Sequence, residues 1–324
     1  MAAPLIAIPD DFPSVFKGSA AHEKCRALGE IRLFSVRGAD EEAELIKRIG
    51  PASVAINIRA HAHFSEGVFA ACPKLKMVSV WGTGVDNIDL TAAGRRGVTV
   101  CNTPGVNAFA VAEHVIALML AVARRIPRID REMREGAWPR EQLVQCLGKT
   151  LGVAGTGKIG ARVIEIGTAL GMTVIAYSAR GDAAHVAGLG ARAVSKDELL
   201  RESDFLSLCL RLAPETRGFL SRRDFTQMKK SAILVNTGRG ALVEREALLD
   251  ALSTGKISAA GLDVFHDEPT KPDDPLLAMP NVVLSPHHAG QTPEVVRDGL
   301  LAAVKNVENY LAGKPTDAVV APMK

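Results

Sequence analysis

Short apolar runs alternate with helix-length segments from one end of the chain to the other. Within each run the apolar residues are consecutive, which is typical of strands covered on both faces. The strands we expect are residues 5–8, 31–36, 54–58, 77–80, 98–101, 150–154, 173–176, 205–210, 232–236, 259–263 and 282–285. Because helix-length segments separate these strands, the pattern predicts βαβ units and parallel sheets.

The same pattern predicts two domains. The chain has 324 residues, 47% of them hydrophobic, which is ample for two cores. A glycine-rich turn at residues 155–160 follows the sixth expected strand, and a nucleotide-binding domain normally begins at the strand before such a turn. We therefore expect the first part of the chain to form a separate domain. The last long helix, about residues 293–311, follows the final expected strand and is a candidate to pack in this first domain.

A helix over residues 108–123 is apolar nearly all round, which indicates a buried helix and a candidate to join the two units. Glu113 and His114 interrupt it, and the run falls short of a membrane span. We expect a hydrogen-bonded structural role for His114.

Composition narrows the function classes. A net charge of +3 and an aromatic content of 4% argue against a nucleic-acid partner. The N-terminus lacks the basic segment of a signal peptide, and the cysteines are scattered without a C-x-x-C pair. These features favour a cytoplasmic protein with reduced thiols, no metal site and no membrane partner.

The turn G-T-G-K-I-G stands between an expected strand and a helix-like segment, which is the setting of a dinucleotide-binding turn. Gly155 permits the tight turn, Gly157 lets the backbone approach a diphosphate, and Gly160 lets helix and strand pack closely. Lys158 and Ile159 lie in the same turn and open the helix, whose free N–H groups attract anions. The alternative is that this glycine-rich turn has only a structural role and binds no nucleotide.

The residues at the end of the next strand should determine whether the protein binds NAD or NADP. An acidic residue there would bind the ribose 2′-hydroxyl of NAD, but the sequence reads Tyr177-Ser178-Ala179-Arg180. Ser178 leaves room for a 2′-phosphate and Arg180 can pair with it, so we favour NADP(H) over NAD(H). The alternative is that Arg180 is a solvated charge and NAD is used.

Three polar residues each follow an expected parallel strand: Arg239, Glu268 and His287. Ligands bind at the carboxyl ends of strands in open α/β sheets, so we expect these side chains to converge there. A site that transfers a hydride together with a proton needs a group that titrates near neutrality, and histidine is the usual choice.

Together with W-G-T-G-V-D-N-I-D at 81–89, N-T-P-G-V-N at 102–107 and V-A-E-H at 111–114, these motifs resemble the D-isomer-specific 2-hydroxyacid dehydrogenase family over nearly the whole chain. The resemblance implies an α/β fold with two Rossmann-like domains. A flavodoxin-like substrate domain would comprise residues 1–103 and 293–324, and a doubly wound NAD(P)-binding domain would be inserted over residues 104–292. It also implies a homodimer formed mainly through the cofactor domains.

The resemblance further implies residue roles. His287 would be the acid/base, Glu268 would stabilise its imidazolium form, and Arg239 would hold the substrate carboxylate and polarise the carbonyl. The backbone amides of Gly82, Thr83 and Gly84 would also bind the carboxylate. Further expected cofactor contacts are Thr237 and Asp263, and the substrate pocket is expected to include Arg59, His61 and Trp81.

Two departures from the family pattern stand out. His288 occupies a position where the family often has an apolar residue. Arg211 stands where relatives often have proline, and it either approaches a 2′-phosphate or is only exposed.

The leading hypothesis is an NAD(P)-dependent oxidoreductase that reduces a 2-keto acid to a D-2-hydroxy acid, with glyoxylate or hydroxypyruvate as the substrate. Phosphoglycerate dehydrogenase is the alternative within the class. A dinucleotide-sensing binding protein, similar to the C-terminal-binding-protein corepressors, is the alternative from another class.

Overall fold

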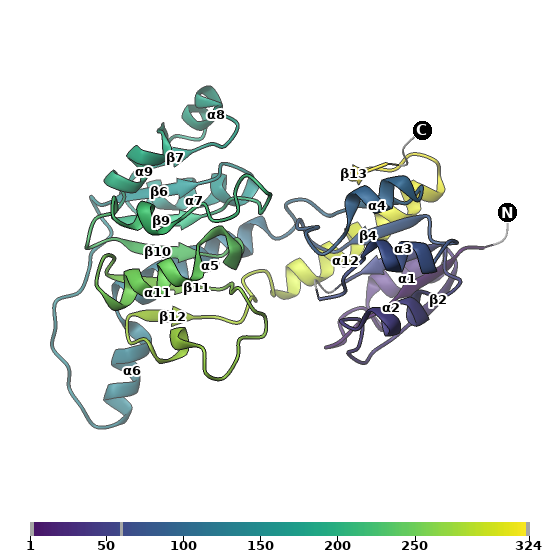
Figure 1. Ribbon diagram of the computed structural model, residues 1–324, viewed down its shortest axis with the longest axis horizontal. Helices are drawn as coiled ribbons and strands as arrows, with labels where there is room; N and C mark the ends of the chain where they lie inside the picture. The colour runs from purple at the N-terminus through teal and green to yellow at the C-terminus, as the bar shows by residue number, and fades with distance from the viewer. Residues whose placement is uncertain (1–2, 59–60, 322–324) are drawn as a thin grey trace. The chain divides into compact units, whose positions relative to one another are not determined.

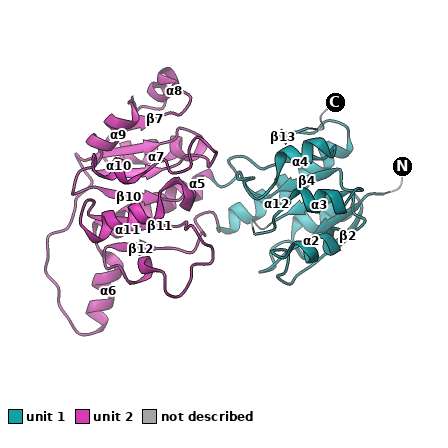
Figure 2. Ribbon diagram, in the orientation of Figure 1, with its two compact units in different colours: residues 1–107, 291–324 teal, residues 108–290 magenta. Residues whose placement is uncertain are grey.

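The computed structural model describes residues 3–58 and 61–321. The chain divides into two compact units, Met1–Asn107 with Gln291–Lys324, and Ala108–Gly290 (Figure 2). The domain boundaries predicted from the sequence were 103/104 and 292/293, whereas the two units of the structure divide at 107/108 and 290/291. Unit 1 is thus built from both ends of the chain, and unit 2 is the inserted segment.

Unit 1 contains a sheet in the order β13-β5-β4-β3-β1-β2, in which only β13 runs antiparallel to its neighbour. Its strands are β1 Leu5–Ile8, β2 Glu30–Leu33, β3 Val54–Asn57, β4 Met77–Val80, β5 Thr99–Cys101 and β13 Ala318–Val320. Helices α1 (Ala20–Arg26) and α12 (Pro293–Leu311) pack together on one face (Figure 1). Helices α2 (Glu42–Ile49), α3 (Glu66–Ala71) and α4 (Leu90–Arg95) cover the other.

Unit 2 contains a wholly parallel sheet in the order β12-β11-β10-β9-β6-β7-β8. Its strands are β6 Thr150–Ala154, β7 Thr173–Tyr177, β8 Arg192–Ala193, β9 Phe205–Leu208, β10 Ile233–Asn236, β11 Ala259–Leu262 and β12 Val282–Leu284. The chain leaves β6 in one direction through β7 and β8 and then returns to its other side at β9. The switch point of a doubly wound fold therefore lies between β6 and β9.

Helices cover both faces of this second sheet (Figure 1). The helices and 3-10 turns of unit 2 are α5 Ala108–Ala123, α6 Ile126–Arg134, α7 Lys158–Ala169, α8 Ala183–Gly188, α9 Lys196–Glu202, α10 Arg222–Phe225, η1 Gly240–Leu242, α11 Arg245–Ser253 and η2 Pro275–Ala278. α5 and α7 pack on one face, and α9, α10 and α11 on the other. α5 is buried along most of its length, as its all-round apolar sequence predicts.

Polar caps fix several helix starts. Ser65, Asp89 and Thr292 each accept a hydrogen bond from the backbone N–H three residues on, which satisfies a donor that has no partner within its helix. Pro293 follows Thr292 in the first turn of α12, where its missing N–H costs nothing.

Every strand expected from the sequence is present, and the expected α/β class with two parallel-dominated sheets is confirmed. β8 and β13 were not expected. Both are short, with two residues in β8 and three in β13, and each has at least one exposed residue, so they lack the long buried apolar run that identified the others. None of the helices within the described ranges has the length and apolar character needed to cross a bilayer.

Candidate active site

Arg239, Glu268 and His287 follow three adjacent strands of unit 2, namely β10, β11 and β12. Because these strands are parallel, all three residues lie beyond the same edge of the sheet. His287 Nδ1 lies 2.5 Å from Glu268 Oε2, and both side chains remain about one-third exposed, at 37% and 35%. The sequence-predicted pair is thus within hydrogen-bonding distance and open to solvent.

The charge of Glu268 is stabilised locally. Burial alone would raise the pKa of this carboxyl, and the hydrogen bond and charge of His287 oppose that rise. The Phe265 backbone N–H, at 3.0 Å, and the charge of Arg239 act in the same direction. The pKa of Glu268 is therefore held below its ordinary value, and Glu268 is a carboxylate at neutral pH.

Asn236, which was not among the residues predicted from the sequence, shapes the turn that carries Arg239. Asn236, the last residue of β10, donates from Nδ2 to the Arg239 carbonyl at 3.0 Å and accepts from the Gly238 N–H at Oδ1, also at 3.0 Å. Arg239 itself donates to the Gly238 carbonyl at 2.8 Å. An asparagine at a strand end commonly closes such a turn, which is the signal that could have found it. Thr237, next in the chain, is buried.

The loop that carries His287 is tied to Asp263, just past β11. Asp263 is fully buried, and its Oδ1 accepts from Ser285 Oγ at 2.6 Å and from the His288 N–H at 3.1 Å. Its Oδ2 accepts from the Ala289 N–H at 3.1 Å. Asp263 was expected as a cofactor contact, and in this structure protein donors engage its carboxylate.

The glycine turn lies at the switch point of the unit 2 sheet, between β6 and α7. A Cβ on Gly155 would lie 2.7 Å from the Cys209 carbonyl oxygen, and one on Gly160 would lie 1.9 Å from the Gly155 carbonyl oxygen. A Cβ on Gly157, in contrast, would meet nothing within 4 Å. The protein thus requires glycine at Gly155 and Gly160, whereas the space over Gly157 is open.

This arrangement fits a dinucleotide diphosphate. No side chain caps the start of α7, and the N-terminus of a helix attracts an anion. Lys158 and Ile159 open the same helix. Within the described ranges, no group of three or more histidine, cysteine, aspartate or glutamate side chains is arranged to hold a metal ion.

Beyond β7 the chain presents Ser178, half-buried, and Arg180, exposed. The nearest downstream carboxylate, Asp182, accepts from the His185 N–H at 2.8 Å and caps α8. Asp182 therefore has a structural use. Arg211, beyond β9, is also exposed.

The expected carboxylate-binding amides belong to unit 1. The Gly82 N–H donates to Thr103 Oγ1 at 2.8 Å, which leaves Thr83 and Gly84 as the amides for that role.

The residues expected to line the substrate pocket also belong to unit 1. His61 Nε2 lies 3.1 Å from the buried carboxylate of Asp10. Trp81 is partly buried, and Arg59 lies outside the described residues.

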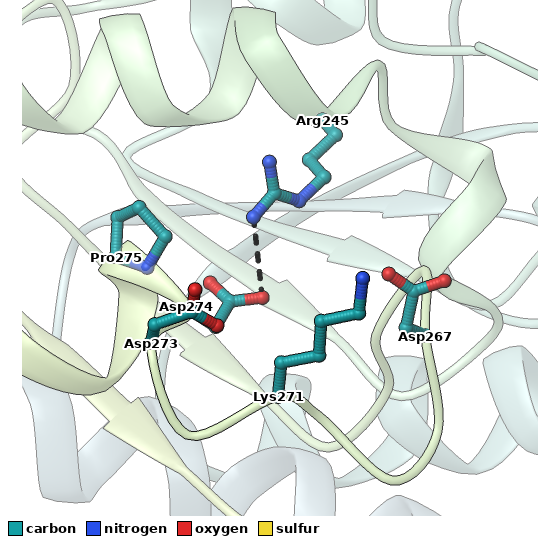
Figure 3. Close-up of a pocket in the computed structure, with 6 residues that line it drawn as sticks. All are labelled: Arg245, Asp267, Lys271, Asp273, Asp274 and Pro275. Carbon is teal, nitrogen blue, oxygen red and sulfur yellow. Dashed lines mark ion pairs between the residues drawn. The ribbon is translucent and has the colours of Figure 1, made fainter.

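A separate pocket in unit 2 is lined by Arg245, Asp267, Lys271, Asp273, Asp274 and Pro275 (Figure 3). Arg245 and Asp274 form an ion pair of 3.3 Å across it. None of Arg239, Glu268 and His287 is among its lining residues. It is therefore distinct from the candidate active site.

A parallel sheet with a glycine turn at its switch point and a histidine–glutamate pair at the same edge defines a dinucleotide-binding oxidoreductase. Comparison with known proteins agrees with this class of protein. The family described as "D-isomer specific 2-hydroxyacid dehydrogenase, NAD binding domain" matches residues 116–289. The chain belongs to this family, as the sequence motifs indicated.

The relatives carry several activities. A glyoxylate reductase from Aeropyrum pernix is 44% identical over 76% of this chain and 76% of its own length. A D-3-phosphoglycerate dehydrogenase from Archaeoglobus fulgidus is 39% identical over 84% of this chain and 52% of its own, so the chain spans about half the length of that protein. Among solved structures, an acyclic imino acid reductase in complex with NADPH and D-Arg is 30% identical, covers 98% of this chain and 100% of its own, and has a TM-score of 0.89.

Proposed function

We propose that this protein is an NADP(H)-dependent reductase that converts a 2-keto acid into a D-2-hydroxy acid, with glyoxylate or hydroxypyruvate as the substrate. The observation that carries the proposal is the 2.5 Å pairing of His287 Nδ1 with Glu268 Oε2, at the sheet edge that also bears Arg239. Relatives named glyoxylate reductase support this substrate class.

Glu268, as a carboxylate, accepts a hydrogen bond from the Nδ1–H of His287. The imidazole then has Nε2 to deliver a proton to the carbonyl oxygen of the substrate, while Glu268 compensates the imidazolium charge. When bound, the cofactor supplies a hydride to carbon 2. The Arg239 guanidinium binds the substrate carboxylate and polarises its carbonyl, and the amides of Thr83 and Gly84 are a second proposed carboxylate contact.

The preference for NADP(H) rests on the residues beyond β7. Ser178 and Arg180 replace the carboxylate that would bind the ribose 2′-hydroxyl of NAD, and Asp182 is engaged in capping α8. Arg180 would pair with the 2′-phosphate, with Arg211 as a second candidate. The dinucleotide itself would be held by Gly155, Gly157, Lys158, Ile159 and Gly160, together with Thr237. The relative solved with NADPH supports this choice.

A panel of substrates with both cofactors tests the function. We expect glyoxylate or hydroxypyruvate to be reduced faster than pyruvate or phenylpyruvate, and NADPH to be used more efficiently than NADH. Preferential oxidation of 3-phosphoglycerate would instead identify a phosphoglycerate dehydrogenase. Tight dinucleotide binding without turnover of any of these acids would favour a dinucleotide-sensing binding protein.

We also propose a homodimer formed through unit 2. The segment around α6 exposes several large apolar side chains: Ile126 at 55%, Met133 at 46%, Trp138 at 71% and Leu147 at 63%. Ion pairs of Arg125 and Arg128 with Glu141 brace this segment. An exposed apolar surface of this kind marks an interaction site, and a second copy of the chain would bury it.

A cytoplasmic location is proposed as well. All five cysteines are free thiols, and burial raises the pKa of Cys25 to about 12 and of Cys101 to about 11. Free thiols in this number are usual in reducing compartments.

A further inference from the structure

His287 has a backbone φ of 50°, in the left-handed region that residues other than glycine rarely adopt. Such a conformation persists only where the surrounding structure imposes it. We propose that His114 and Ser285 are positioning residues that hold His287 in this conformation through Asp263. The proposal rests on the proposed function in one respect, which is that His287 is the acid.

Asp263 restrains the loop on both sides of His287. Ser285, two residues before His287, donates its hydroxyl to Oδ1 at 2.6 Å. The N–H groups of His288 and Ala289, which follow His287 directly, donate to Oδ1 and Oδ2 at 3.1 Å each. Because the carboxylate is fully buried, water cannot replace these donors without opening the loop.

His114 completes the arrangement from α5, which is remote in sequence. Its Nε2 lies 2.8 Å from Ser285 Oγ. Ser285 has a single hydroxyl proton, and Asp263 takes it, so Ser285 Oγ accepts from His114 and the proton of that bond belongs to Nε2. The result is a chain of donors that runs from His114 through Ser285 to Asp263. Hydrogen bonds in such a chain strengthen one another.

The electrostatics agree with this direction of donation. Burial would raise the pKa of Asp263, but the hydrogen bonds from His114, Ser285, His288 and Ala289 outweigh it and hold the pKa below its ordinary value. Asp263 is therefore charged at neutral pH and acts only as an acceptor.

Removal of the Ser285 hydroxyl breaks two links of this chain without touching Glu268 or the glycine turn. In Ser285→Ala we expect kcat for 2-keto acid reduction to fall at least tenfold, while the Kd for NADPH changes less than twofold. A misplacement of about 1 Å at a reacting group is enough to cost this much or more. Ser285→Thr, which retains the hydroxyl, should recover most of the activity.

Amide hydrogen exchange of residues 285–290 in the full-length protein supplies a readout that needs no turnover. The His288 and Ala289 amides should exchange at least tenfold faster in Ser285→Ala than in the wild type, and at near wild-type rates in Ser285→Thr. His114→Phe removes the donor to Ser285 Oγ together with the 3.5 Å contact between His114 Nε2 and Asp263 Oδ1, and it should show the same direction of change. It keeps the test decisive if Ser285→Ala does not fold.

Ser203→Ala is the matched control, because Ser203 is likewise a buried serine of unit 2 and its hydroxyl donates to the Leu199 carbonyl. It should leave both kcat and the exchange of residues 285–290 unchanged. Unchanged exchange in Ser285→Ala and His114→Phe would overturn the proposal. If the wild type reduces no 2-keto acid, the proposed function fails, while the exchange rates still decide whether this chain of hydrogen bonds holds His287.

Discussion

His287 Nδ1 lies 2.5 Å from Glu268 Oε2, although the two residues come from loops that follow different strands. The short contact fixes which imidazole nitrogen faces the carboxylate, and hence which one is left for the substrate. The pair thus acts as one unit in the proposed reduction.

Replacement of either partner should separate their roles. His287→Ala should lower kcat by about 10²–10⁴-fold, the usual contribution of a general acid, with little change in cofactor Kd. Glu268→Gln keeps the shape but removes the charge that stabilises imidazolium. Its fall in kcat/KM toward high pH should therefore begin at a lower pH than in the wild type.

Asp267→Asn is the control for that experiment, because Asp267 is an exposed carboxylate in the same loop. Its pH profile should match the wild type. Full turnover by His287→Ala would refute the assignment of the acid.

Asn236 should matter through the Arg239 turn. Asn236→Ala loses two hydrogen bonds that shape this turn, so we expect the KM for the 2-keto acid to rise about tenfold, as about 1.4 kcal/mol of lost positioning would produce. Asn281→Ala is a matched control, since Asn281 Nδ2 also donates to two backbone carbonyls in unit 2, away from Arg239. An equal change in both variants would show a general loss of stability instead. Steady-state kinetics together with thermal unfolding distinguish the two outcomes.

Gly157 should be required by the ligand and not by the fold. A Cβ at this position meets no protein atom, so Gly157→Ala should keep the wild-type melting temperature but bind NADPH at least tenfold more weakly. Gly188→Ala is the control, because its Cβ also meets nothing within 4 Å. Nucleotide titration by fluorescence, paired with calorimetry, measures both effects. Normal NADPH affinity in Gly157→Ala would contradict the diphosphate site.

Arg180 should discriminate between the cofactors. A hydrogen bond to a charged group contributes about 1.5–3 kcal/mol, so Arg180→Ala should raise the Kd for NADPH by roughly 10–100-fold and leave that for NADH nearly unchanged. Arg201→Ala, an exposed arginine of α9, is the control. The double variant with Arg211→Ala shows whether Arg211 contributes. A wild type that binds NADH more tightly than NADPH would reverse the proposed preference.

The apolar segment around α6 should govern association. Met133→Ser combined with Trp138→Ser removes two exposed apolar side chains and should convert the dimer into a monomer in light scattering after gel filtration. Val36→Ser is the control, because Val36 is 62% exposed but lies in unit 1. A wild-type protein that is monomeric at micromolar concentration would exclude the homodimer.

Much of this protein could be derived from its sequence alone. Continuous apolar runs identified the strands because strands buried on both faces carry no polar alternation. The glycine turn and the residues after β10, β11 and β12 were readable because a parallel sheet brings strand ends to one edge. β8 and β13 were not predicted because they have only two and three residues, and so short a strand carries little sequence pattern.

Only the tertiary structure decided how the candidate side chains are held. Ser285 reads as an ordinary strand-end serine, and Asp263 reads as a residue free to meet a cofactor. Their hydrogen bonds with His114 join segments up to 171 positions apart, and no local pattern encodes such a contact. The sequence determined which chemical groups reach the sheet edge, whereas the packing of α5 against the sheet decided which of them hold His287 in place.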